Sequence, residues 1–112
     1  MKRDRPTLGH LGGKLTDEVD AVISREEATA VLVHGDTSSA LMAGLAASYA
    51  QIPVGHVEAG LRSHNMLDPF PEEQNRVLIS RLARWHFVPT EQAKSNLESE
   101  GMTGFPASWT AK

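Results

Sequence analysis

The pattern of apolar and polar positions predicts alternating helices and strands along the first half of the chain. Residues 11–27 place apolar side chains on one stripe at helical spacing. Residues 29–33 are rich in β-branched side chains and apolar on both faces, which is typical of a buried parallel strand. Ser38 or Ser39 can cap a second helix, which extends to about residue 50 and whose small residues would let it lie close on a sheet.

The second half of the chain continues this alternation. Residues 52–57 predict a second strand, and a loop with several glycine and proline residues follows. Pro71 and the two acidic residues after it have the composition of a first helical turn. Residues 85–88 predict a short third strand. Thr90 then caps a last helix that Gly101 can end.

Strands that alternate with helices predict right-handed crossovers and a doubly wound parallel sheet. Three strands make only half of such a domain, and a chain of 112 residues holds one small core. We therefore expect an α/β chain that is part of a Rossmann-like domain over residues 1–101. Residues 102–112 show no period and are expected to form a divergent, disordered tail.

Composition removes several classes of function. The formal net charge is −3, and the 11 basic residues form no stripe that could follow a nucleic-acid backbone. The chain has no cysteine, so disulfides and thiolate metal sites are excluded. The uncharged stretch at residues 37–55 contains serine, glutamine and proline among its alanines, so we do not expect it to span a membrane. With no signal peptide in its first 20 residues, the chain is expected to be cytoplasmic.

Three acidic residues are expected to meet at one edge of the sheet. Asp36 follows the first strand and Glu58 follows the second, and ligands of open α/β sheets bind outside the carboxyl ends of the strands. Glu72 begins a crossover helix that must start at that same edge. Neighbouring carboxylates in different environments can supply one acid and one base at neutral pH. We therefore predict a catalytic role for this group.

Other interpretations of these acids stay open. Asp36 could belong only to a turn that caps the next helix. Glu72 and Glu73 could both be partners of the helix dipole. Of these two, we expect Glu73 to point away from the site.

The histidines suggest a second possibility. His34 with Asp36, and His56 with Glu58, could bind a divalent metal ion. Histidines at strand ends more often bond to a loop carbonyl, so we predict no metal site. The Gly35 turn could also receive an anion, although no P-loop or dinucleotide fingerprint is present. The remaining histidines are isolated and are expected at the surface or half-buried: His10, His64 and His86.

Four longer motifs resemble the family of non-hydrolysing UDP-N-acetylglucosamine 2-epimerases. They are VLVHGDT at residues 31–37, IPVGHVEAGLR at 52–62, PFPEEQNR at 69–76 and HFVPTE at 86–91. The four motifs are spread in this order over about half of the chain, and the resemblance extends from about Leu8 to Gly101. A match of this length is far more specific than a single glycine pattern.

The resemblance implies a fold and a reaction. The fold is two Rossmann-like domains of glycosyltransferase-B type, in a homodimer, with substrate in the cleft between the domains. The reaction interconverts UDP-GlcNAc and UDP-ManNAc, without NAD or metal, by elimination of UDP to a 2-acetamidoglucal and its return. The resemblance places the family's catalytic or substrate-contacting acids at Asp36, Glu58 and Glu72, and leaves open which one removes the C2 proton. It also implies that Arg62 fixes the loop or binds substrate.

Two parts of the family pattern have no match in these residues. One is an initial strand and loop with basic substrate contacts; the other is the second domain, with most of the UDP site and a catalytic histidine. We therefore expect little or no activity from the 112 residues alone. Two other functions stay open. One is a hydrolysing relative that releases ManNAc and UDP, and the other is a non-catalytic fragment or subunit that associates with an intact epimerase or a separately encoded remainder.

Overall fold

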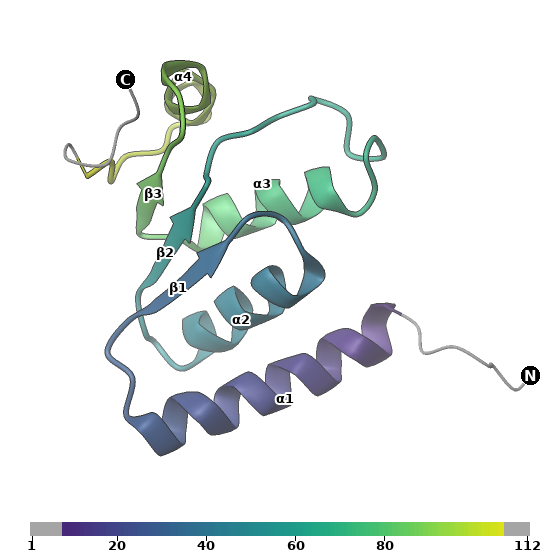
Figure 1. Ribbon diagram of the computed structural model, residues 1–112, viewed down its shortest axis with the longest axis vertical. Helices are drawn as coiled ribbons and strands as arrows, with labels where there is room; N and C mark the ends of the chain where they lie inside the picture. The colour runs from purple at the N-terminus through teal and green to yellow at the C-terminus, as the bar shows by residue number, and fades with distance from the viewer. Residues whose placement is uncertain (1–7, 107–112) are drawn as a thin grey trace, which may run out of the picture.

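The computed structural model describes residues 8–106, which form a three-stranded parallel sheet and four helices (Figure 1). The strand order is β1-β2-β3, so each strand lies beside the next strand of the sequence. The elements are α1 (Leu8–Glu26), β1 (Val31–His34), α2 (Ser38–Tyr49), β2 (Val54–Val57), α3 (Glu72–Leu82), β3 (Trp85–Phe87) and α4 (Glu91–Ser99). The predicted α/β class is confirmed, and each predicted element occurs close to its expected position.

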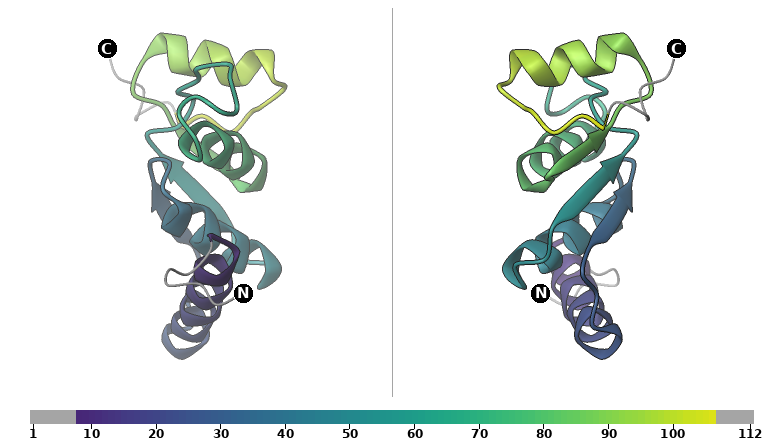
Figure 2. Two further views of the ribbon diagram at one scale, coloured as in Figure 1. Left: turned by 90° about the vertical axis from the view of Figure 1, so that its right-hand side faces the viewer. Right: turned by 90° about the vertical axis from the view of Figure 1, so that its left-hand side faces the viewer.

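The two faces of the sheet differ in their cover. The parallel register places Val33 beside His56 and His56 beside His86, and all three side chains are buried. Successive side chains alternate between the faces of a strand. Leu32 therefore lies on the opposite face, beside Gly55, and it is 64% exposed. In the right-hand view of Figure 2 the strands β1 and β2 lie in front of the helices, so this second face is open.

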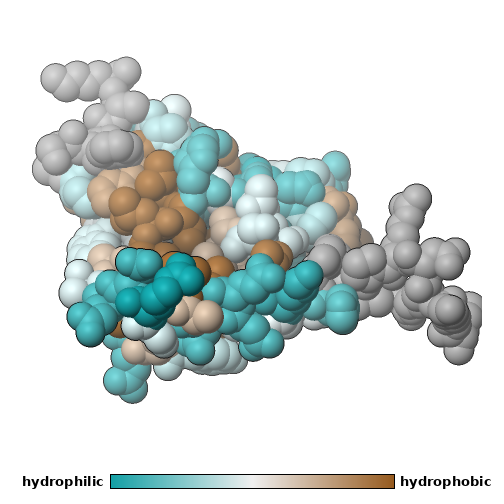
Figure 3. Space-filling view, turned by 60° about the horizontal axis from the view of Figure 1, so that its bottom comes forward, coloured by the Kyte–Doolittle hydropathy of each residue, from teal (hydrophilic) through white to brown (hydrophobic). Residues whose placement is uncertain are grey.

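The main core lies between the covered face and helices α1, α2 and α3. Helix α2 packs close to the sheet because its inner side chains are small: Ala46 and Ala47 are 2% and 0% exposed. The other buried members of this core are Ile23, Val33, Ala40, Leu41, Val54 and Ile79. Figure 3 shows one area of apolar surface on the left of the view, which is also the side on which Figure 1 draws the strands. No helix within residues 8–106 is long and apolar enough to cross a membrane.

The predicted cap residue is confirmed at α4 and is wrong at α2. Thr90 caps α4 as predicted, and its hydroxyl accepts from the Ala93 N–H at 3.1 Å. Helix α2 is capped by Thr37, not by Ser38 or Ser39 as expected. The Thr37 residue is extended, so its hydroxyl reaches the N–H of the third residue onward, as an N-cap requires.

A second apolar cluster joins α4 to the loop after β2. It contains Ala59, Val88, Ala93 and Leu97. Gly60 has a φ of +91°, and a Cβ there would collide with the Ala93 carbonyl oxygen, so the close approach of α4 requires glycine at this position.

The segment after Gly101 has no helix or strand up to residue 106. It packs against the second cluster through Met102 and Phe105, and the Gly104 carbonyl accepts a hydrogen bond from the His86 N–H at 2.9 Å. The rest of the predicted tail, residues 107–112, lies outside the described residues.

Candidate active site

The loop that carries Asp36 is held by its backbone. Gly35 turns the chain after β1 with a φ of +77°, a conformation that suits glycine. The Gly35 N–H donates to the Val57 carbonyl at 3.0 Å, which extends the pairing of β1 and β2. The Asp36 carbonyl accepts from the buried Asn75 side chain at 2.9 Å. The loop is therefore attached both to β2 and to α3.

The Asp36 carboxylate is also attached to α3, through Arg76. Arg76 Nη1 donates to Asp36 Oδ2 at 3.1 Å, while Arg76 Nε and Nη2 contact Glu73 Oε1 at 3.1 and 2.9 Å. The Arg76 and Glu73 side chains are 12% and 1% exposed, whereas the Asp36 side chain is 32% exposed. Since Thr37 makes the α2 cap, the capping interpretation of Asp36 does not apply. The Asp36 carboxylate faces Arg76 and remains partly exposed to solvent.

Glu73 does not point away from the site as expected. Its Oε2 atom accepts the His64 N–H at 3.0 Å, so it joins α3 to the loop after β2. Burial raises the pKa of this carboxyl, but the Ser63 and His64 N–H groups and Arg76 together lower the pKa below its usual value. Glu73 is therefore a buried anion that holds Arg76 and the loop.

Glu58 follows β2 in a conformation that is unusual for its residue type. Its φ is +66°, which costs a non-glycine residue about 1–3 kcal/mol. Hydrogen bonds on both sides hold this backbone, from Gly35 N to Val57 O and from Ala59 N to Phe87 O, each at 3.0 Å. The Glu58 Oε2 atom lies 2.9 Å from His34 Nε2, and the Glu58 side chain is 45% exposed. The strained backbone therefore presents an accessible carboxylate beside an imidazole.

Glu72 is the first residue of α3 and is half-buried. It precedes Arg76 by one helical turn, so both lie on the same side of the helix. Within residues 8–106, the Glu72 side chain has no hydrogen-bond or ion-pair partner. The structure thus places Asp36 against the start of α3, where Glu72 is the first residue. Glu58 lies beside His34, at the end of β1.

Arg62 lies in the loop after β2, and its side chain is 1% exposed. It donates to both carboxylate oxygens of Glu100 at 2.9 and 3.1 Å, to Ser80 Oγ at 2.8 Å and to the Leu61 carbonyl at 2.8 Å. Because the Arg62 guanidinium is buried and its donors bond within the protein, the structure favours the alternative that Arg62 fixes the loop over the alternative that it binds substrate. It fixes the loop after β2 to the end of α4.

The two histidines of the metal hypothesis lie on opposite faces of the sheet. His34 is on the open face, with its side chain 70% exposed, while His56 is buried on the covered face. His56 Nε2 lies 2.7 Å from the Gly35 carbonyl oxygen, which is the loop contact that we weighed against metal binding. Among residues 8–106, no group of three or more histidine, aspartate or glutamate side chains could hold a metal ion. His86, expected at the surface or half-buried, is instead 2% exposed.

Three residues that shape this site were not predicted as site residues from the sequence: Glu73, Asn75 and Arg76. All three belong to the PFPEEQNR motif, in which we selected only Glu72. One local signal was available, because Glu73 and Arg76 are spaced i, i+3 and can pair on a helix. Nothing local indicated that the pair would be buried against Asp36.

The parallel α/β unit matches solved structures of glycosyltransferase-B type, so it is part of a fold of that class. The family model of UDP-N-acetylglucosamine 2-epimerase matches residues 1–105. The chain belongs to the UDP-N-acetylglucosamine 2-epimerase family.

Named relatives agree with this family. The chain is 60% identical over 72 residues to a UDP-N-acetylglucosamine 2-epimerase of Neisseria meningitidis, covering 64% of this chain and 19% of the relative. A solved N. meningitidis UDP-GlcNAc 2-epimerase, bound to UDP-GlcNAc, matches with a TM-score of 0.86 and 43% identity over 99% of this chain and 29% of its own. The Methanocaldococcus jannaschii enzyme, in complex with UDP-GlcNAc and UDP, matches with a TM-score of 0.83 and 43% identity over 88% of this chain and 27% of its own. The chain thus spans less than a third of the length of these relatives.

Proposed function

We propose that this chain carries the acidic part of the active site of a UDP-N-acetylglucosamine 2-epimerase, which interconverts UDP-GlcNAc and UDP-ManNAc. The observation that carries the proposal is the placement of Asp36, Glu58 and Glu72 on three segments at the carboxyl ends of the strands. Two family members bind UDP-GlcNAc in solved structures, which supports this class of substrate.

The proposed reaction is an elimination followed by an addition. A carboxylate removes the proton from C2 of the sugar, the C1–O bond to UDP breaks, and a 2-acetamidoglucal forms. UDP then returns to C1 while C2 receives a proton on the opposite face. The net change is an isomerisation, so electrons balance without an oxidant or reductant. Asp36, Glu58 and Glu72 supply the acid–base groups, and an exposed, strained Glu58 beside His34 suits a group that must reach substrate.

The remainder of such an enzyme would have to hold the UDP group. We propose that the 112 residues alone do not epimerise UDP-GlcNAc, because elimination requires a bound leaving group. A proton NMR assay of the C2 epimer tests this, and clear turnover by the pure chain would contradict it. We also propose that the complete enzyme is a homodimer, as the resemblance implies, and that it lies in the cytoplasm.

A chimera tests the site itself. Residues 8–101 replace the matching segment of the solved N. meningitidis enzyme, and UDP-GlcNAc turnover is measured. Asp36→Asn, Glu58→Gln and Glu72→Gln should each lower turnover about 10²- to 10⁴-fold, the usual contribution of a general acid or base. Each amide keeps the shape of its carboxylic acid but cannot exchange the proton. An inactive but folded chimera, or amides that leave turnover intact, would overturn the proposal.

A second candidate function is a non-catalytic subunit that associates with an intact epimerase or a separately encoded remainder. The open face of the sheet favours it, because Leu32 is 64% exposed there and exposed apolar sheet faces often bind a partner. Sedimentation of the chain mixed with the intact N. meningitidis enzyme tests this candidate. A stable complex, weakened by Leu32→Lys, would support it, and two separately sedimenting species would contradict it.

A further inference from the structure

His56 occupies an unusual place for a polar side chain. It lies in the middle strand β2, between Val33 and His86 in the register, and none of its surface is exposed. Its Nε2 atom lies 2.7 Å from the Gly35 carbonyl oxygen, while its Nδ1 atom is buried without a hydrogen-bond partner in the described part of the chain. An apolar side chain would avoid the cost of that unpaired nitrogen. Packing alone therefore does not explain a histidine here.

The contact with Gly35 does explain it. A carbonyl oxygen only accepts hydrogen bonds, so Nε2 must carry the proton and donate. Burial lowers the pKa of His56, and the positive charge of Arg62 and the neighbouring His34 lower it further, against the opposing effects of the Gly35 carbonyl and Asp36. The ring is therefore neutral at neutral pH, with its single N–H directed at the loop that carries Asp36.

The loop has three backbone attachments, and His56 is one of them. The Gly35 N–H bonds to Val57 O, the Asp36 carbonyl bonds to the Asn75 side chain, and the Gly35 carbonyl bonds to the His56 ring. Without a donor there, the peptide between Gly35 and Asp36 could rotate. That rotation would move the Asp36 side chain away from Arg76 Nη1, which lies 3.1 Å from its carboxylate.

We propose that His56 is a positioning residue. Its ring donates to the Gly35 carbonyl from the covered face of the sheet and so fixes the Asp36 carboxylate for reaction without touching substrate. This inference rests on the proposed function of Asp36. It assigns to His56 a role in turnover, rather than in binding or folding alone.

Turnover by the chimera tests the inference. His56→Leu should lower kcat about 10- to 100-fold with little change in KM, because a shift of about 1 Å in a reacting group can cost 10²-fold. His56→Gln places an amide N–H close to the position of Nε2 and should recover most of the lost turnover. His86→Leu is the matched control, since His86 is an equally buried histidine beside His56 that makes no contact with Gly35. The folded His86→Leu chimera should have the same kcat as the parent chimera.

A double-mutant cycle separates positioning from general damage. In the Asp36→Asn chimera the carboxylate no longer exchanges protons, so adding His56→Leu should cost far less than it does in the parent. The same loss in both backgrounds, or equal effects of His56→Leu and His86→Leu, would overturn the inference while leaving the proposed function intact. If Asp36→Asn alone does not lower turnover, that result would instead count against the proposed function.

A second measurement needs no turnover. Two-bond ¹H–¹⁵N spectra of the ¹⁵N-histidine-labelled 112-residue chain report which ring nitrogen carries the proton. We expect the Nε2–H form for His56 at pH 7, and a signal from the Nδ1–H form would overturn the inference.

Discussion

Arg76 and Asp36 are 40 residues apart in the sequence, and Arg76 Nη1 lies 3.1 Å from Asp36 Oδ2. The same guanidinium contacts Glu73, whose other oxygen accepts the His64 N–H. One buried ion-pair network therefore joins the loops after β1 and β2 to the first turns of α3. The relative positions of the candidate acids depend on this network as well as on the sheet.

Glu73→Gln in the chimera should therefore lower turnover, although Glu73 reaches no substrate in our proposal. The amide can still accept the His64 N–H, but it leaves Arg76 without its buried anionic partner. Arg76 would then be held by Asp36 alone among these acids and could shift, and we expect a loss of about 10- to 100-fold, typical of a misplacement near 1 Å. Steady-state kinetics of purified, folded protein measures it.

The matched control is Glu91→Gln, which removes an acid from the first turn of α4 at an exposed position. Both variants lose a favourable interaction with a helix dipole. Equal turnover of the two variants would show that the Glu73 network does not position the site.

The sequence predicts the elements and the strand-end position of the acids because those signals are local. Asp36 and Glu58 follow apolar strands directly, and parallel strands place their carboxyl ends at one edge. Side-chain direction was not predictable in the same way. Glu73 faces inward because the His64 backbone lies there, and Arg62 is buried because Glu100, 38 residues later, accepts from it.

The cap of α2 shows the same limit at short range. Three hydroxyl residues in succession can each cap a helix, and only the extended conformation of Thr37 decides between them. The burial of His86 depends on the later segment at Gly104 and Phe105, which covers β3. No periodicity marks that segment in the sequence.

Glu100→Gln should lower the free energy of unfolding of the chimera, because Arg62 would stay buried without a charged partner. The Arg62 side chain is 1% exposed and Glu100 is 24% exposed, so we expect a loss of about 2–4 kcal/mol, near the lower end for broken buried pairs. Urea denaturation followed by tryptophan fluorescence measures it. Glu98→Gln, at an exposed position of the same helix end, is the control. Similar losses for both would contradict a buried ion pair.

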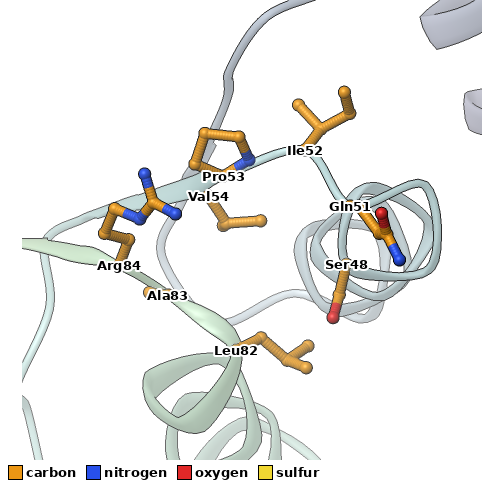
Figure 4. A pocket seen from close by; sticks show the side chains of 8 residues that line it. All are labelled: Ser48, Gln51, Ile52, Pro53, Val54, Leu82, Ala83 and Arg84. Carbon is orange, nitrogen blue, oxygen red and sulfur yellow. The ribbon is translucent and has the colours of Figure 1, made fainter.

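A groove at the other end of the strands is lined by Arg84, Ser48 and Gln51 among apolar neighbours, as Figure 4 shows. It lies where β2 begins, and the candidate acids lie where β1 and β2 end. Arg84→Gln in the chimera should therefore leave UDP-GlcNAc turnover unchanged. A loss as large as that of Asp36→Asn would place the site at the wrong end of the sheet.

The open face of the sheet should make the isolated chain associate with itself. Leu32 is 64% exposed there, and exposed apolar faces and strand edges favour association. Leu32→Lys should shift the chain toward the monomer in analytical ultracentrifugation. Val22→Lys is the control, because Val22 is 44% exposed on α1, away from the sheet. A parent chain that is strictly monomeric and melts cooperatively would contradict this prediction.

The buried histidines should make the fold sensitive to acid. Burial, together with smaller contributions from the neighbouring His56 and Arg62, lowers the pKa of His86 from 6.5 to about 4. The unfolded chain then binds a proton at His86 between pH 6.5 and about 4, where the folded chain does not. Stability from this group is therefore complete above pH 6.5 and is lost as the pH falls toward 4, by about 2–4 kcal/mol.

His86→Leu removes this contribution, so the unfolding free energy of the parent chimera should fall by about 2–4 kcal/mol more than that of the variant as the pH falls from 7 to 4. The difference between the two proteins isolates the histidine, because every carboxylate is common to both. His56, whose pKa burial also lowers, should contribute in the same direction, so His86→Leu reduces the acid sensitivity without removing it. A His86 ring proton that titrates near pH 6.5 in NMR spectra of the folded chimera would show that the ring is not desolvated, and the parent and variant would then lose stability in parallel.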